Sequence, residues 1–181
     1  MYPNQTLKPR VLIVHTGGTI GMRPSEAGYT PVAGFEALLR EKLINSVHDT
    51  LPEFDLIEFE HLIDSANLVP DDWQTIAQTL TDHYDDYDGF VVLHGTDTMA
   101  YTASALSFQL TGLSKPVIVT GSQIPLVELR NDALDNLISA LIIAGFHPVP
   151  EVCVYFNGRL LRGNRSRKVK ATGLDAFDSP N

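Results

Sequence analysis

Three apolar runs in this chain end abruptly in glycine and small hydroxyl residues. They cover residues 11–15, 90–94 and 117–119, and they lead into the polar segments 16–19, 95–98 and 120–122. Short uninterrupted runs of Val, Ile and Leu are typical of strands that are buried on both faces of a parallel sheet. The carboxyl ends of such strands meet at one edge of the sheet, where open α/β folds bind their ligands. We therefore expect several hydroxyls, glycine amides and the Asp97 carboxylate to share one crevice, an arrangement suited to acyl-transfer chemistry.

Helical patterns alternate with these strands along the chain. This alternation predicts an α/β protein, with a mostly parallel sheet in a three-layer αβα (Rossmann-like) arrangement. Strands are expected at residues 10–15, 55–59, 89–94, 116–120, 151–156 and, as a shorter one, 168–172. Helices are expected at residues 35–45, 70–84, 97 or 98 to 110, and 129–144. Residues 23–31, which carry Pro, Ser and Gly without periodicity, and residues 62–69 are predicted to be loops.

Composition narrows the class of partner and the compartment. The 181 residues fit one domain with a sizeable core, and their net charge of −9 argues against nucleic acid or an anionic membrane as a partner. No apolar run approaches the roughly 20 residues that a membrane span needs. Residues 1–5 lack the basic start of a secretory signal, and the single cysteine, Cys153, is predicted to be buried in a strand. These features favour a reducing compartment.

Two glycine-rich segments invite a nucleotide-binding interpretation. Residues 16–21 follow a strand, but Thr16 stands where the dinucleotide fingerprint needs its first glycine. Residues 158–163 have the glycine spacing of a phosphate loop, but Asn164 and Arg165 replace the required Lys and Ser/Thr. We expect no cofactor.

The six histidines show no metal-ligand spacing and have no cysteine partners. We therefore expect no metal site. His15 and His94 both end buried strands, and each is predicted to be a core histidine with satisfied hydrogen bonds.

Thr19 and Thr96 follow neighbouring strand ends, and each has a glycine beside it. One could supply the attacking hydroxyl and the other a second hydroxyl around the same acyl carbon, with backbone amides stabilising an oxyanion. For residues 95–98 the alternative is helix capping by their hydroxyl and carboxylate oxygens. A threonine nucleophile needs a base. No histidine is suitably placed, so Lys168 or a tyrosine would have to serve.

Residues 16–21 (Thr-Gly-Gly-Thr-Ile-Gly) and 94–100 (His-Gly-Thr-Asp-Thr-Met-Ala) resemble the two signature segments of the bacterial-type L-asparaginases. Supporting matches are residues 64–65, 120–125 and 162–168, and the resemblance covers essentially the whole chain. It implies hydrolysis of L-asparagine to L-aspartate and ammonia. Because no signal peptide is recognised, the sequence resembles the cytoplasmic type I branch of this family.

The resemblance implies a role for each matching residue. Thr19 would be the nucleophile that forms a β-aspartyl ester, later hydrolysed by water, and Tyr29 would lie on a mobile lid that closes over it. Thr96, Asp97 and Lys168 would form the second catalytic group. A lysine acts as a base only when it is neutral, whereas an adjacent carboxylate favours its ammonium form. Which group first takes the proton of Thr19 therefore stays open.

Substrate binding is implied for a second set of residues. Asp97, beside Thr96, would hold the substrate α-amino group, and Ser65 would grip the α-carboxylate together with the backbone of Asp64 and Ala66. Ala66 departs from the family pattern, because relatives often carry a polar residue at this position. One substrate hydrogen bond is therefore expected to be absent.

The resemblance also implies a domain organisation and partners. Residues 1–181 would be the N-terminal domain, without the family's smaller C-terminal domain, and the site would be completed across a subunit interface. L-Glutamine would be a weaker substrate, the full-length protein would be a dimer or tetramer, and the isolated domain would fold but have little activity. Two alternatives are a non-catalytic small-molecule-binding module and an ammonia-supplying subunit of a tRNA-dependent amidotransferase, which the acidic charge disfavours.

Overall fold

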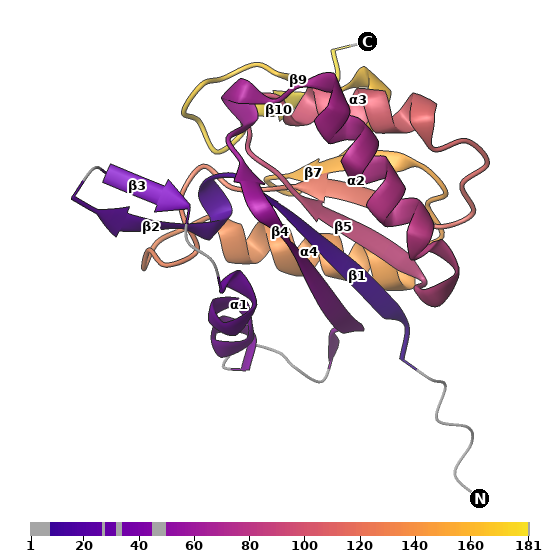
Figure 1. Cartoon of the computed structure of the whole chain (residues 1–181), viewed down its shortest axis with the longest axis horizontal. Coiled ribbons are helices and arrows are strands. Elements are labelled where there is room, and N and C mark those ends of the chain that lie inside the picture. Colours follow the sequence, from indigo (N-terminus) through magenta and orange to yellow (C-terminus); the bar gives the residue numbers. More distant parts are fainter. Residues whose placement is uncertain (1–7, 27, 32–33, 45–49, 181) are drawn as a thin grey trace, which may run out of the picture.

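A computed structural model describes residues 8–26, 28–31, 34–44 and 50–180. Its centre is a six-stranded sheet in which β8 pairs antiparallel with its neighbour and the other adjacent pairs are parallel (Figure 1). In spatial order the strands are β4 (Glu53–Ile63), β1 (Arg10–Gly17), β5 (Gly89–Leu93), β6 (Val117–Thr120), β7 (Val152–Phe156) and β8 (Arg159–Arg162). The predicted mostly parallel sheet is confirmed.

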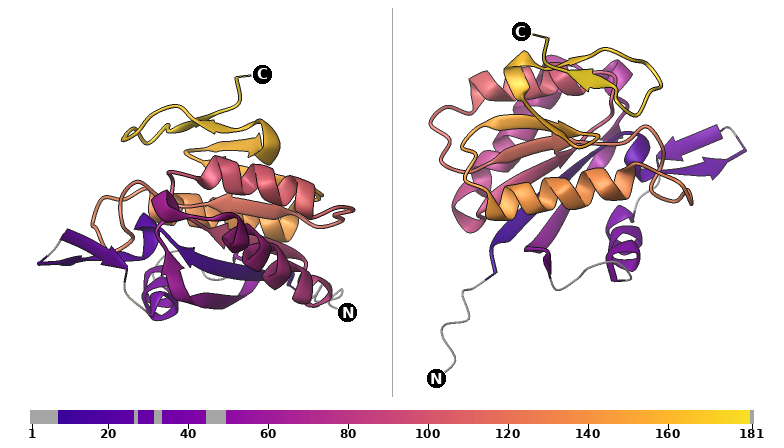
Figure 2. Two further views of the ribbon diagram at one scale, coloured as in Figure 1. Left: turned by 45° about the horizontal axis from the view of Figure 1, so that its top comes forward. Right: turned by 180° about the vertical axis from the view of Figure 1, so that it is seen from behind.

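Helices cover both faces of this sheet, which gives the predicted three layers (Figure 2). The helices are α1 (Phe35–Ile44), α2 (Pro70–Asp82), α3 (Met99–Gln109) and α4 (Ala133–Phe146). Successive side chains of a strand point to opposite faces, so Leu12 and Val14 of β1 pack in the core with α2 and α3. Val11 and Ile13 pack in the core with α1 and α4. All four side chains are fully buried, which explains the unbroken apolar run.

The strand order reverses at β1. The chain leaves β1 through α1 to β4 on one side, and then crosses through α2 to β5 on the other side of β1. Open α/β sheets bind ligands at such a reversal, outside the carboxyl ends of the strands. Thr16 lies at this point, where its hydroxyl donates to the carbonyl of Leu93 on β5 at 2.9 Å. The carboxyl ends of β1 and β5 are therefore fastened side by side.

Several connections differ from the sequence-based expectations. Residues 23–31 are not a loop: β2 (Met22–Ser25) and β3 (Gly28–Pro31) form an antiparallel hairpin that projects from the sheet. Its strands are largely exposed, so the apolar alternation that reveals a half-buried strand is absent. The strand expected at 168–172 is the two-residue β9 (Arg167–Lys168), which pairs with β10 (Phe177–Asp178).

Other helices, strands and turns also differ from those expected from the sequence. The edge strand β8 was not predicted, and α4 begins at Ala133 rather than at residue 129 because the preceding residues belong to a loop. Short 3-10 turns were missed as well, namely η1 (Thr19–Gly21), η3 (Ser65–Asn67), η4 (Tyr84–Asp86) and η5 (Gly163–Arg165). The expected helix end at Asn45 and the sequence start at 1–5 lie outside the described residues. No helix in the described part is long and apolar enough to cross a membrane.

Two of the buried side chains predicted from sequence behave as expected. Cys153 is buried on β7, and burial raises the pKa of its thiol to about 11. His94 is buried with both ring nitrogens bonded. Because a carbonyl only accepts, Nδ1 donates to the Gly95 oxygen at 2.7 Å, and the Thr102 hydroxyl donates to Nε2 at 2.9 Å. Burial lowers the pKa of His94, which fits this neutral ring. The imidazole thus fixes the backbone just before Thr96.

The prediction for His15 is confirmed for its burial in the core and wrong for its hydrogen bonds. Its ring is fully buried, yet neither nitrogen has a hydrogen-bond partner among the described residues. The ring packs against Phe35 of α1, with the centroids 4.4 Å apart. Burial lowers the pKa of His15 to about 4, against a smaller opposing effect from Glu58 on the adjacent strand β4.

Acidification is expected to destabilise the fold through His15. The unfolded chain binds a proton near pH 6.5, whereas the folded chain does so only near pH 4. The contribution of the neutral His15 ring to the free energy of unfolding is therefore fully present above about pH 6.5. It falls as the pH drops towards 4 and does not change further below that pH. The loss should approach about 3 kcal/mol, and denaturant titrations at pH 7.5 and pH 4.5 measure it.

The variant His15→Leu should lose this component of the pH dependence, while the exposed His147→Leu serves as the matched control. Equal pH dependence in wild type and His15→Leu would contradict the assignment.

Candidate active site

Three backbone segments meet at the carboxyl edge of the sheet. A Cβ atom added to Gly18 (φ +89°) would lie 2.4 Å from the Gly95 nitrogen, and one added to Gly95 would lie 2.3 Å from Ser65 Oγ. These glycines therefore allow contacts that no other residue would permit. The residues that follow them are Thr19 and Thr96. The structure thus brings the segments that carry both threonines together with Ser65.

Thr19 begins η1, the short turn after β1, and is partly buried. The next residue in the turn, Ile20, is fully buried, and its carbonyl accepts from the Leu126 amide at 3.1 Å. Leu126 belongs to the loop of residues 121–132 between β6 and α4, which we call the 121–132 loop. The turn that carries Thr19 is therefore attached to a loop from another part of the sheet.

Thr96, Asp97 and Lys168 form one cluster. Lys168 Nζ donates to Thr96 Oγ1 at 2.9 Å and to Asp97 Oδ1, also at 2.9 Å. Thr96 is nearly buried and the Lys168 side chain is 17% exposed, whereas the Asp97 side chain is 61% exposed. The cluster therefore presents a carboxylate outward and keeps the amine close to a shielded hydroxyl.

Sequence reasoning assigned no role to Gln123, which belongs to this cluster. The Thr96 hydroxyl donates to Gln123 Oε1 at 3.2 Å, and Gln123 Nε2 donates to the carbonyls of Ala171 and Gly173, each at 3.1 Å. Its backbone amide donates to the nearly buried carboxylate of Asp132 at 3.0 Å. The only signal in the sequence was its place in the segment 120–125 that follows β6.

Ser65 is buried in η3, directly after β4. The Thr98 hydroxyl donates to the Ser65 carbonyl at 2.8 Å and makes no side-chain capping bond to α3. The helix-capping alternative for Thr98 is therefore not supported. The carboxylate of Asp64 accepts from the Ala66 amide at 3.1 Å, so this amide already has an intramolecular partner.

Tyr29 lies on β3 and is half-exposed. Its hydroxyl donates to Glu128 Oε1 of the 121–132 loop at 2.6 Å, and this bond raises the pKa of the phenol. The structure records no hydrogen bond between Tyr29 and Thr19 among the described residues.

The nucleotide interpretations find no support in the geometry. After β1 the chain enters the three-residue turn η1 and then the β2–β3 hairpin, so no helix N-terminus follows. Residues 159–162 of the second segment form the edge strand β8, and Gly163 begins the turn η5, so this segment is not a phosphate loop. Within the described ranges, no group of three or more His, Cys, Asp or Glu residues is arranged to hold a metal ion.

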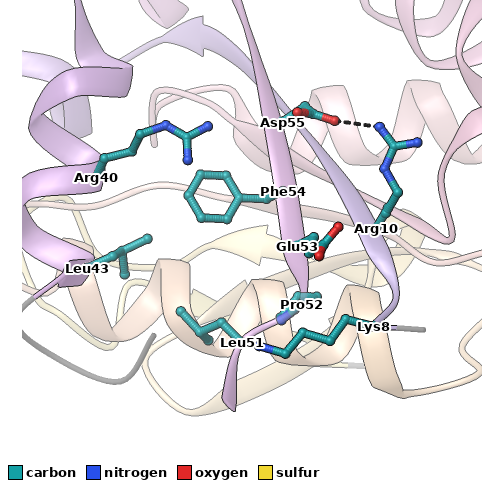
Figure 3. A pocket seen from close by; sticks show the side chains of 9 residues that line it. All are labelled: Lys8, Arg10, Arg40, Leu43, Leu51, Pro52, Glu53, Phe54 and Asp55. Atoms are coloured by element: carbon teal, nitrogen blue, oxygen red, sulfur yellow. Dashed lines mark hydrogen bonds and ion pairs between the residues drawn. The ribbon is translucent and has the colours of Figure 1, made fainter. Parts of the chain in front are cut away.

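Two cavities help to delimit the site. A cleft of about 530 Å³ borders the cluster and includes Asp97, Tyr101 and Lys168 in its lining. A second, of about 400 Å³, lies at the amino-terminal ends of β1 and β4, where Arg10 pairs with Asp55 (Figure 3). The first cleft lies beside the carboxyl ends of the parallel strands, whereas the second lies at their amino-terminal ends, on the opposite side of the sheet. Only the first cleft therefore belongs to the candidate site.

Comparison with known proteins identifies the same family. The family model described as "Asparaginase, N-terminal" matches residues 10–181. L-asparaginase 1 of Escherichia coli K12 is 56% identical over 176 residues, which cover 96% of this chain and 52% of that protein. A more distant relative, a glutamyl-tRNA(Gln) amidotransferase subunit of Methanopyrus kandleri, is 37% identical over 94% of this chain and 39% of its own length.

Solved structures agree with this result. L-asparaginase I of Vibrio cholerae is 50% identical, with a TM-score of 0.87 over 96% of this chain and 52% of that one. The probable cytoplasmic L-asparaginase of Campylobacter jejuni is 28% identical, with a TM-score of 0.81 over the same shares. The chain thus spans about half the length of these relatives. On its sequence, its fold and the arrangement of its strand ends, the chain belongs to the asparaginase family.

Proposed function

We propose that the full-length protein containing this chain hydrolyses the side-chain amide of L-asparagine to L-aspartate and ammonia through a threonyl acyl-enzyme. The observation that carries this proposal is the 2.9 Å contact of Lys168 Nζ with Thr96 Oγ1, beside the strand end that bears Thr19. An amine bonded to one hydroxyl, with the strand end that bears the second hydroxyl packed alongside through glycine backbone, suits nucleophilic attack on a carbonyl.

In the proposed mechanism, Thr19 Oγ attacks the amide carbon, and the backbone amides near Gly18 and Gly95 stabilise the developing oxyanion. The proton of the Thr19 hydroxyl is passed to the amide nitrogen, the C–N bond breaks, and ammonia leaves. Water then adds to the ester, its bond to Thr19 Oγ breaks, and Thr19 Oγ regains a proton as L-aspartate is released. Lys168 and Thr96 are proposed to activate one of the two nucleophiles, either the Thr19 hydroxyl or the water that hydrolyses the ester. Because the amine now donates to Thr96, whose own proton lies towards Gln123, this hydroxyl must turn before it can pass a proton to a neutral lysine.

Substrate recognition is proposed at the rim of the same crevice. The exposed carboxylate of Asp97 is suited to an α-ammonium group. Ser65, next to Gly95, would hold the α-carboxylate. The Ala66 amide would have to exchange its bond with the Asp64 carboxylate to take part.

We also propose a context for this site. Residues 1–181 are proposed as the N-terminal domain, which the match of residues 10–181 to the N-terminal family model supports. A second domain and a second subunit are proposed to complete the site. We propose that this protein is a cytoplasmic dimer or tetramer. L-Glutamine is proposed as the weaker substrate, because its extra methylene displaces the amide from the nucleophile.

The test is ammonia release by the full-length protein supplied with L-asparagine, measured together with L-aspartate formation. We expect equal amounts of both products without an added partner or tRNA, and little or no turnover by residues 1–181 alone. Binding of L-asparagine without product would favour the non-catalytic module. Ammonia release that requires a partner protein would favour the amidotransferase alternative, which is suggested by the similarity to the amidotransferase subunit of Methanopyrus kandleri.

A further inference from the structure

We propose that Glu128 is a positioning residue, which holds the phenol of Tyr29 and with it the β2–β3 hairpin at the edge of the active-site crevice. This inference rests on the proposed function, because it concerns how the residue suggested to cover Thr19 is held. It adds to that function a residue of the 121–132 loop which the sequence motifs did not mark.

The contact itself is short and joins two distant parts of the chain. The Tyr29 hydroxyl donates to Glu128 Oε1 at 2.6 Å, across 99 positions of sequence. Phenols bound to a carboxylate form charge-assisted bonds, which are shorter and stronger than neutral ones. The raised pKa of Tyr29, caused first by this hydrogen bond, agrees with a phenol that keeps its proton and donates it to the carboxylate.

Burial does not hold Tyr29 in place. The side chain is 49% exposed, and the hairpin strands are mostly exposed on both faces. The Ser25 hydroxyl donates to the Gly28 carbonyl at 2.7 Å, which closes the turn but does not attach the hairpin to the body of the protein. A directed bond at the Tyr29 tip is therefore well placed to decide where the hairpin lies.

Glu128, in contrast, has a fixed backbone. Its amide donates to the Pro125 carbonyl at 3.0 Å, and its carbonyl accepts from Asn131 Nδ2 at 2.7 Å. A carboxylate on so well-held a backbone can serve as an anchor for the phenol.

The loop that carries Glu128 also reaches both threonines. Its Leu126 amide bonds to Ile20, next to Thr19, and its Gln123 side chain bonds to Thr96. The nearly buried carboxylate of Asp132 binds the amides of Gln123 and Ile124 and so fixes the start of the loop. A hairpin docked on Glu128 is thus aligned with the same backbone that aligns the catalytic hydroxyls.

The test uses the full-length protein and four variants: Glu128→Ala, Glu128→Gln, Tyr29→Phe and the double variant Tyr29→Phe/Glu128→Ala. Loss of one hydrogen bond predicts that Glu128→Ala lowers kcat/KM for L-asparagine by about 3- to 10-fold. Glutamine keeps an accepting oxygen, so Glu128→Gln should recover much of this loss. In the Tyr29→Phe background, Glu128→Ala should have no further effect.

A matched control is Glu26→Ala, which removes a carboxylate from the tip of the same hairpin. Within the described ranges, this carboxylate has no recorded hydrogen bond or ion pair. It should leave kcat/KM unchanged. A second readout is the ionisation of Tyr29, followed as the difference between the ultraviolet pH titrations of each protein and of its Tyr29→Phe counterpart. Glu128→Ala should lower the pKa of this phenol.

Three results would overturn the inference in an active enzyme. They are kinetics of Glu128→Ala equal to or faster than wild type, equal losses in the alanine and glutamine variants, and additive effects in the double variant. Absence of ammonia release by the wild type is a different result, because it overturns the proposed function and this inference together.

Discussion

Replacement of Thr19 by alanine is expected to reduce kcat for ammonia release from L-asparagine by about 10⁴-fold or more. The variant lacks the oxygen that is proposed to form the ester, so the proposed acyl-enzyme route is closed. The residue is only partly buried at the start of η1, so its loss should leave the fold intact. A coupled assay of ammonia under saturating L-asparagine measures the effect, and L-asparagine binding should persist.

The control for Thr19 is Thr75→Ala, which removes an exposed threonine hydroxyl from α2 and should leave kcat unchanged. Thr96→Val keeps the shape of the second threonine but removes the hydroxyl between Lys168 and Gln123, and it should also abolish most turnover. Substantial activity in Thr19→Ala would refute the proposed nucleophile. Activity in both variants would reduce the two threonines to turn residues.

The second large effect is expected for Lys168→Met. Methionine fills a similar volume but has no amine, so the proposed proton path through Thr96 is lost and the Asp97 carboxylate loses its cation. A positioned general base contributes about 10²- to 10⁴-fold to a rate, and we expect kcat to fall by about this factor. The change should appear in kcat more than in KM, because the amine acts on the hydroxyl and not on the bound substrate.

The chain offers a close control for this variant. Lys170, two residues further along, also pairs with a carboxylate, that of Asp175, but lies outside the cluster of Thr96, Asp97 and Lys168. Lys170→Met should therefore retain the kcat of the wild type. Equal losses in the two variants would indicate that the segment around β9 needs its charges for folding, and it would remove the support for Lys168 as a catalytic group.

The parts of the fold that sequence reasoning predicted well are those buried on both sides. The strands β1, β5 and β6 show uninterrupted apolar residues because each face packs against a helix layer. The sequence did not reveal the hairpin or β8, since these elements lie at the exterior and their side chains are largely exposed. A hydrophobic pattern, whether an unbroken apolar run or an alternation, carries information only where a strand buries at least one of its faces.

Some residues of the candidate site could likewise be predicted from the sequence, and others could not. The motifs marked Thr19 and Thr96, because a strand-end glycine with a neighbouring hydroxyl is visible locally, whereas Ser65 came only from the resemblance to the family. His15 shows the opposite case: a histidine at a strand end looks the same in the sequence whether its nitrogens are bonded, as in His94, or not. Nor did any local pattern indicate that Gln123 bonds to Thr96, or Glu128 to Tyr29.

The sequence by itself therefore determined the α/β class, the family and the residues on which the chemistry is proposed to depend. The class follows from short apolar runs that alternate with helical patterns, and the family and the residues follow from the resemblance of two short motifs, both of which can be read locally. Only the tertiary structure decided the order β4-β1-β5-β6, the packing of Gly18 on Gly95 and the bonds from the 121–132 loop to Thr96 and Tyr29. These contacts join residues 27 to 99 positions apart, and which of them form depends on how the whole sheet assembles.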